Sequence, residues 1–254
     1  MKHELNYSRV RSLQELSALQ TEDAYYLIGG DYNVDPPAGL KNLVDLQDLD
    51  LETQAVPQGW RLVPAMVSIQ KALQALEALP ALAEAASLEG GRNLRNSLSL
   101  GNYLRHGDAN GPLRVCLAAL GVQTGFLNQE DPSKWADTQA QFAAGRIPLY
   151  LLFPEGGALA FESIGRSPKD KPILCLAVYR SKNNDLRVGI SHSAAGVKVF
   201  EFENSSQADY QALVDALADS GDAWASAEYR QAVVHPLLER ALKKLAAAVE
   251  EERP

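Results

Sequence analysis

The pattern of apolar residues changes at residues 154–157, where the sequence reads PEGG. Before this point, short strand-like apolar runs alternate with stretches in which apolar residues recur every three or four positions, as in helices. After it, four strand-like segments and then two helical stretches follow one another (158–166, 172–180, 186–194, 197–203, 206–220 and 227–252). Strands joined by short turns pair antiparallel. The chain is therefore predicted to be α+β, with domains at 1–153 and 154–254.

The first domain has its own order of expected elements. Helices are expected over 13–19, from 66 to 76, from Pro80 onward and over 135–145, and strands near 25–28, 43–46, 60–66 and 147–153. Residues 88–112 are polar and rich in glycine and asparagine, so they are expected to form a long loop. Pro236 is expected to kink or split the last helix.

Composition excludes several classes of partner. The formal charge is −8 and the pI is near 5.1, so the chain as a whole does not attract nucleic acid or anionic membranes. No secretion signal is apparent, and no apolar run approaches the roughly 18 residues of a membrane span. Cys116 and Cys175 lie in apolar runs, which predicts buried thiols in a reducing cytoplasm.

The sequence has no recognisable catalytic or metal-binding motif. The four histidines do not lie at ligand spacing from each other or from a cysteine, and no CxxC, GxSxG, P-loop or GxGxxG occurs. Acidic residues cluster at Asp45, Asp48, Asp50 and Glu52, but such acids in strands and turns are usually solvated. These observations favour a chain without catalytic acids or metal ligands of its own.

Two glycine-bearing segments remain, at 29–37 and 90–112. The first follows an apolar run directly, in the sequence YYLIGGDYNVDPP. Backbone N–H groups can hold a phosphate without any cationic side chain, and glycine allows the close approach. Glycine is equally at home in ordinary tight turns, where it takes left-handed backbone angles. The residues alone leave both interpretations open.

Four groups of segments, in order along nearly the whole chain, carry a resemblance to one family. They are YLIGGDYNV (26–34), GLKNLVDLQDLDLE (39–52), LPALAEAASLEGGRNLRNSLSLGNYL (79–104), and in the last part 158–166, 186–196 and 226–242. Together they resemble the medium, FAD-binding subunit of the molybdenum hydroxylases, which include the xanthine and carbon monoxide dehydrogenases. Each motif is weak alone, and their order and spacing make the resemblance specific.

The resemblance implies a two-lobed FAD-binding domain of the molybdopterin-dehydrogenase type, followed by a small antiparallel sheet with helices. In that family two loops hold the FAD pyrophosphate through backbone amides, and the flavin relays electrons between iron–sulfur clusters and an external acceptor. The implied partners are an iron–sulfur subunit and a molybdopterin-containing large subunit, in a cytoplasmic hetero-oligomer. The implied cofactor-binding positions are Gly29, Gly30, Asp31, Tyr32, Asn33, Ser99, Gly101, Asn102 and Tyr103.

This sequence departs from the family pattern in both loops. Tyr32 replaces a small hydroxyl residue, Asn102 replaces the second glycine, and Tyr103 replaces an asparagine. The Ser-Asp pair that helps to hold the flavin falls at Gly111-Pro112. Asp31 would lie near a dianionic pyrophosphate, at a cost of roughly 3 kcal/mol per charge pair at about 5 Å and an effective dielectric near 20. The two tyrosines would instead be able to stack on a flavin or adenine ring.

Three functions are therefore weighed. The family resemblance favours an FAD-binding electron-transfer subunit. The altered loops favour a flavin-free structural or assembly homologue that keeps the fold and its docking surface. A stand-alone flavoprotein oxidase is disfavoured, because no catalytic acid or base is visible.

Overall fold

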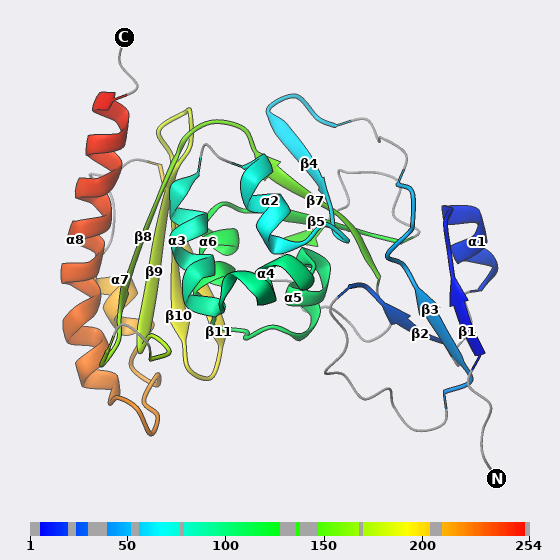
Figure 1. Ribbon diagram of the computed structural model, residues 1–254. Helices are drawn as coiled ribbons and strands as arrows, with labels where there is room; N and C mark the ends of the chain where they lie inside the picture. Colours follow the sequence, from blue (N-terminus) through cyan, green and yellow to red (C-terminus); the bar gives the residue numbers. More distant parts are fainter. Residues whose placement is uncertain are drawn as a thin grey trace.

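The computed structural model describes residues 6–19, 24–29, 40–51, 56–76, 79–127, 136–137, 147–167, 170–203 and 210–251. Three β-sheets follow one another across the molecule in Figure 1, from the N-terminal sheet at the right to the C-terminal sheet and α8 at the left. Helices fill the space between the second and third sheets. The predicted α+β fold, with an antiparallel sheet after residue 154, is confirmed.

The first sheet is small and parallel, with strand order β1-β3-β2. Its elements are β1 (Asn6–Arg9), α1 (Leu13–Ala18), β2 (Ala24–Leu27) and β3 (Asn42–Asp45). Ser12 starts α1 by accepting a hydrogen bond from the Glu15 amide. Val44 and Leu46 are buried in a core that also takes in Leu149 and Leu152 of β7, so this sheet packs on the second one.

The second sheet has the order β4-β7-β5-β6, and all its pairs are antiparallel. Its strands are β4 (Trp60–Pro64), β5 (Gln123–Phe126), β6 (Ala136–Asp137) and β7 (Pro148–Pro154). Five helices belong to this part: α2 (Ile69–Ala75), α3 (Pro80–Glu89), α4 (Arg92–Ser97), α5 (Leu100–His106) and α6 (Pro112–Ala119). As expected, a helix begins at Pro80. The prediction of a helix over 135–145 is wrong at Ala136–Asp137, which form a strand. The other residues of that range lie outside the described part.

The prediction of a long loop over residues 88–112 is also wrong, because α4 and α5 lie within this range. These helices have six and seven residues, too few to show a helical period in the sequence. Helices this short are marginal alone and depend on tertiary packing. In α5 that packing is extensive, with five consecutive residues buried, Leu100 to Leu104.

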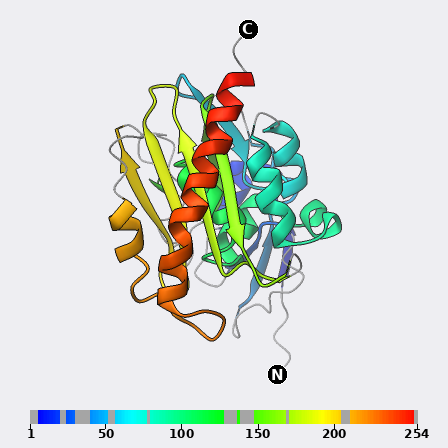
Figure 2. The same cartoon turned by 90° about the vertical axis from the view of Figure 1, so that its left-hand side faces the viewer.

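The third sheet is antiparallel, with the order β11-β10-β9-β8. Its strands are β8 (Ala158–Ile164), β9 (Leu174–Arg180), β10 (Leu186–His192) and β11 (Gly196–Phe202), followed by α7 (Tyr210–Asp215) and α8 (Ala227–Glu251). Figure 2 shows α8 lying across the outer face of this sheet. On the inner face, α6 contacts β9 and β10, and α3 contacts β8. The sheet is therefore covered by helices on both sides.

The alternation of side chains along β9 shows this double burial directly. Leu174, Leu176 and Val178 enter the core beneath α8, whereas Cys175, Ala177 and Tyr179 enter the core shared with α3 and α6. Cys116 of α6 and Cys175 are free and buried, as predicted, and burial raises the pKa of both thiols. Gly189 of β10 allows α6 to come close, because a Cβ there would lie 2.8 Å from the Val115 carbonyl oxygen.

Pro236 does not split the last helix. It lies inside α8, which continues for 25 residues without interruption. Buried side chains before and after the proline, Val234 and Leu238 among them, anchor both parts of the helix to the sheet. Although α8 is long, no helix in the described ranges is both long and apolar enough to cross a membrane.

Candidate functional site

The two predicted loops meet at a cleft between the first sheet and the start of α5. The Ser99 hydroxyl donates a hydrogen bond to the Ile28 carbonyl, and the Ser99 amide donates to the Gly29 carbonyl at 3.4 Å. Further along α5, the Arg105 guanidinium donates to the Tyr26 carbonyl at 3.0 Å. Gly29 and Ser99 both line the cleft, which has a volume of about 630 Å³. Two segments 70 positions apart in the sequence are thus held together at one opening.

Gly29 has a backbone that few other residues adopt. Its φ is +96°, and a Cβ at this position would lie 3.2 Å from the Ser99 Cβ. Both the conformation and the contact with α5 therefore require glycine. Gly30, Asp31, Tyr32 and Asn33, the other predicted binding positions of this loop, lie outside the described residues.

The second loop uses its backbone donors inside the protein. Ser99, Leu100 and Gly101 donate their amides to the carbonyls of Gly29, Val67 and Ala65, and Asn102 donates its amide to the Ser99 Oγ. An amide has one hydrogen, so each donor already engaged is lost to a ligand. The expectation that Ser99 and Gly101 direct donors toward a phosphate does not match this arrangement.

Gly101 has a packing role in the structure. A Cβ here would lie 3.0 Å from the Ala65 Cβ, 3.1 Å from the Ala65 carbonyl oxygen and 3.3 Å from Pro148. Glycine thus lets α5 approach the turn after β4. Asn102, the next residue, is 2% exposed, and its side-chain nitrogen has no hydrogen-bond partner among the described residues. Neither residue lines the cleft.

Tyr103 points into the core, where it is 2% exposed. Its hydroxyl donates to the Glu89 carboxylate at 2.5 Å and accepts from the Arg114 amide at 3.1 Å. The same Glu89 oxygen accepts from the Leu113 amide at 3.0 Å. Glu89 and Tyr103 together cap the first turn of α6, which starts at Gly111 without a side-chain cap of its own. The Tyr103 ring is therefore engaged inside the protein, not free to stack on a ligand in the cleft.

The cleft has charged side chains of both signs. Arg9 is paired with Asp48 at 2.8 Å. Lys71, in the first turn of α2, lines the same cleft, and no described residue pairs with its ammonium group. Sequence reasoning missed Lys71, because nothing in the local pattern brings α2 beside the first loop. The only available signal was its place three residues after the helix-capping Ser68.

Comparisons with known proteins identify the fold. No family model matches the sequence, and no curated protein matches it. Solved structures match end to end. A reconstituted CO dehydrogenase from Oligotropha carboxidovorans matches with a TM-score of 0.71 and 22% identity, over 98% of this chain and 99% of that chain.

Two further solved structures agree with this match. A carbon monoxide dehydrogenase from Hydrogenophaga pseudoflava has a TM-score of 0.71 and 20% identity, over 96% and 98% of the two chains. Quinoline 2-oxidoreductase from Pseudomonas putida 86 has a TM-score of 0.70 and 18% identity, over 98% and 99%. At such identities the likeness shows a common fold over the full length. Carbon monoxide dehydrogenase is one of the enzyme types that the sequence resemblance had indicated.

We expect Gly101→Ala to lower the free energy of unfolding by about 1–3 kcal/mol, because the new methyl group would be forced against Ala65 and Pro148. Urea unfolding of the flavin-free protein measures this loss. The control is Gly91→Ala, where an added Cβ meets nothing within 4 Å, and we expect a loss below about 1 kcal/mol. Equal effects of the two substitutions would contradict the packing role of Gly101.

Glu89→Gln tests the buried cap on α6. Burial raises the pKa of Glu89 and outweighs the hydrogen bonds from Tyr103 and Leu113, which lower it. The folded protein therefore holds this proton more tightly than the unfolded chain, whose glutamate pKa is about 4.3. The stability of the wild type relative to Glu89→Gln should be greatest below that value and should fall as the pH rises through the folded-state pKa.

Urea unfolding at a series of pH values measures this difference. Glu228→Gln is the opposite control, since hydrogen bonds from its own amide and from Ser226 lower the pKa of the exposed Glu228. The stability due to Glu228 should be present above the unfolded-state pKa and should be lost as the pH falls. If the stability of the wild type relative to Glu89→Gln instead increases with pH, this account of the cap is wrong.

Proposed function

We propose that this chain is the FAD-binding, electron-transfer subunit of a molybdenum hydroxylase-type complex. The observation that carries the proposal is the meeting of Gly29 and Ser99 at one cleft, within a fold shared end to end with chains of carbon monoxide dehydrogenase and quinoline 2-oxidoreductase. The electrons would pass between iron–sulfur clusters of a partner and an external acceptor.

The described residues fit FAD on one side of the cleft. The volume of about 630 Å³ lies in the usual range for cofactor sites, roughly 300–1,000 Å³. The chain from Gly29 to Asn33 and the ammonium group of Lys71 would hold the pyrophosphate. Lys71 would supply a positive charge beside the pyrophosphate, in a cleft that Asp48 and Asp50 also line. A bound flavin supplies the electron-transfer chemistry.

In this proposal the second loop has a different task from the one that the resemblance implies. Ser99 lines the cleft and holds the first loop through its bonds to Ile28 and Gly29, whereas Gly101 packs α5 against Ala65. Asn102 and Tyr103 support α5 from within, and their contacts to a ligand are not part of the proposal. The protein would therefore grip the pyrophosphate from the first loop and from α2.

A flavin-free structural or assembly homologue is the second candidate. It is favoured by the same backbone bonds, which leave no amide of residues 99–102 for a phosphate. It is also favoured by Glu89, whose carboxylate accepts from an α6 amide next to the position of the missing Ser-Asp pair. In this reading the fold and its docking surface are kept and the cofactor is lost.

Both candidates assume partner chains. The described residues include no group of three or more His, Cys, Asp or Glu side chains that could hold a metal ion. We propose that an iron–sulfur subunit and a molybdopterin-containing large subunit carry those centres, in a cytoplasmic hetero-oligomer. The formal charge of −8 disfavours nucleic acid as a further partner, because the phosphate backbone is also negative.

Titration of the flavin-free protein with FAD and FMN distinguishes the two candidates. FAD should bind more tightly than FMN, because FMN lacks the pyrophosphate. Asp31→Asn should tighten FAD binding by removing a repulsion, and Lys71→Met should weaken it about tenfold, the usual effect of one charge-assisted contact. Flavin fluorescence quenching gives the affinities.

Lys243→Met is the matched control, because Lys243 is exposed on α8 far along the chain from the cleft, and it should leave the FAD affinity unchanged. Gly101 is unsuitable as a test position, since its substitution disturbs packing. If neither the wild type nor Asp31→Asn binds FAD at high micromolar concentration, the flavin-free candidate is correct.

We expect the chain to copurify with an iron–sulfur protein and a large molybdopterin protein when it is isolated at native levels from its own host. Size-exclusion chromatography with mass spectrometry of the bound chains tests this. Binding to partners is common to both candidates. A monodisperse monomer with no associated protein would therefore count against both, whereas failure to bind FAD counts against the first alone.

A further inference from the structure

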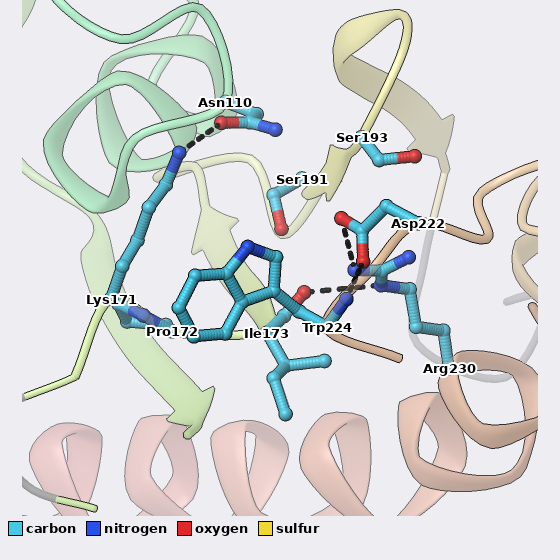
Figure 3. A pocket seen from close by; sticks show the side chains of 9 residues that line it. All are labelled: Asn110, Lys171, Pro172, Ile173, Ser191, Ser193, Asp222, Trp224 and Arg230. Atoms are coloured by element: carbon cyan, nitrogen blue, oxygen red, sulfur yellow. Dashed lines mark hydrogen bonds and ion pairs between the residues drawn. The ribbon is translucent and has the colours of Figure 1, made fainter. Parts of the chain in front are cut away.

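A second cavity, of about 210 Å³, lies where the loop after α5 meets the third sheet and the start of α8. Four stretches of chain build it and bring nine side chains together (Figure 3): Asn110, Lys171, Pro172, Ile173, Ser191, Ser193, Asp222, Trp224 and Arg230. None of these residues lines the cleft at Gly29. The cavity is thus a separate site in the described part of the chain.

One hydrogen-bond donor of this cavity, the indole N–H of Trp224, has no acceptor in the described structure. Ser191 is 6% exposed; its oxygen accepts from the Cys175 amide at 2.8 Å, and its hydroxyl also hydrogen-bonds the Cys175 side chain, so it is engaged within the sheet. The indole of Trp224 lies across the cavity in Figure 3, with its ring nitrogen on the side of Ser191. A ligand with an acceptor atom would satisfy the indole N–H.

The two cations of the lining are both ion-paired, and one of them keeps a donor for a ligand. Arg230 is 3% exposed and binds Asp222 at 2.7 Å and the Ile173 carbonyl at 3.2 Å, so it is fixed at the wall. Lys171 pairs with Asp108, which does not line the cavity, and donates to Asn110 at 3.2 Å, so one of its three N–H groups remains. The remaining N–H of Lys171 is therefore the charged donor that the lining offers to a ligand.

The carboxylate of Asp222 is already occupied by hydrogen bonds within the protein. Asp222 accepts from Arg230, from the Trp224 amide at 2.8 Å and from the Ala225 amide at 3.1 Å. The donors left for a ligand are the Trp224 indole N–H and the remaining N–H of Lys171. Together they favour a ligand with acceptor atoms and a negative charge.

Trp224 adds a requirement on shape. It is 57% exposed, unusual for so large an apolar side chain, and the Arg166 guanidinium lies 4.2 Å from its ring centroid. An aromatic wall favours a planar ring. The cavity volume equals that of about seven waters at roughly 30 Å³ each, which suits a molecule with one ring.

We propose that this cavity binds a small aromatic monocarboxylate. Its carboxylate would accept hydrogen bonds from Lys171 and from the indole N–H of Trp224, and its ring would lie against the indole. The site is independent of FAD binding at the cleft and goes beyond the proposed electron-transfer function.

Calorimetric titration of the purified chain with benzoate tests this proposal. We expect one site, and we expect benzamide, which has the same shape without the charge, to bind at least about tenfold more weakly. Lys171→Met and Trp224→Leu should each weaken benzoate binding about tenfold, with folding checked by circular dichroism. The control is Lys243→Met, which replaces an exposed lysine on α8 and should leave benzoate binding unchanged.

Three results would overturn the proposal. The first is no benzoate binding up to about 10 mM, where even weak specific binding is measurable. The second is equal binding of benzoate and benzamide by the wild type, a comparison that needs no variant to fold. The third is displacement of benzoate by FAD, which would make the cavity part of a flavin site.

Discussion

The third sheet can exist only if both of its faces are covered, and much of the architecture follows from this. Residues of β9 alternate between two separate cores, one beneath α8 and one shared with α3 and α6. A strand that is apolar on both faces destabilises the fold unless both faces are removed from water. The second core contains residues of the first part of the chain, such as Leu117, together with Phe161 and Cys175. The core therefore crosses the sequence position at which two domains were expected.

The placement of α6 against this sheet in turn fixes the second loop. The start of α6 is capped by Glu89 of α3 and by the hydroxyl of Tyr103 in α5, so three helices are tied at one point. The amides at the start of α5 are bonded to Ala65, Val67 and Gly29. A segment with the composition of a phosphate loop thus stabilises the protein itself. Besides Gly29 of the first loop, the described cations of the cleft are Lys71 and Arg9, and Arg9 is paired with Asp48.

Sequence reasoning succeeded where one residue type decides the local structure. Pro80 begins a helix, and apolar runs such as 174–178 form buried strands. It failed for α4 and α5, because short polar helices have too few residues for a periodic pattern and depend on contacts made elsewhere. The split expected at Pro236 is also absent, because packing of the flanking turns against the sheet outweighs the loss of one backbone donor.

The sequence by itself determined the acidic character and the succession of four strands before the last helices. These depend on composition and on side-chain periodicity, which are local properties. Only the tertiary structure decided that the amide of Gly101 donates to Ala65, that Tyr103 points inward, and that Lys71 and the residues around Trp224 line cavities. The partner of a hydrogen bond or a charge lies far away in the chain, so no local pattern specifies it.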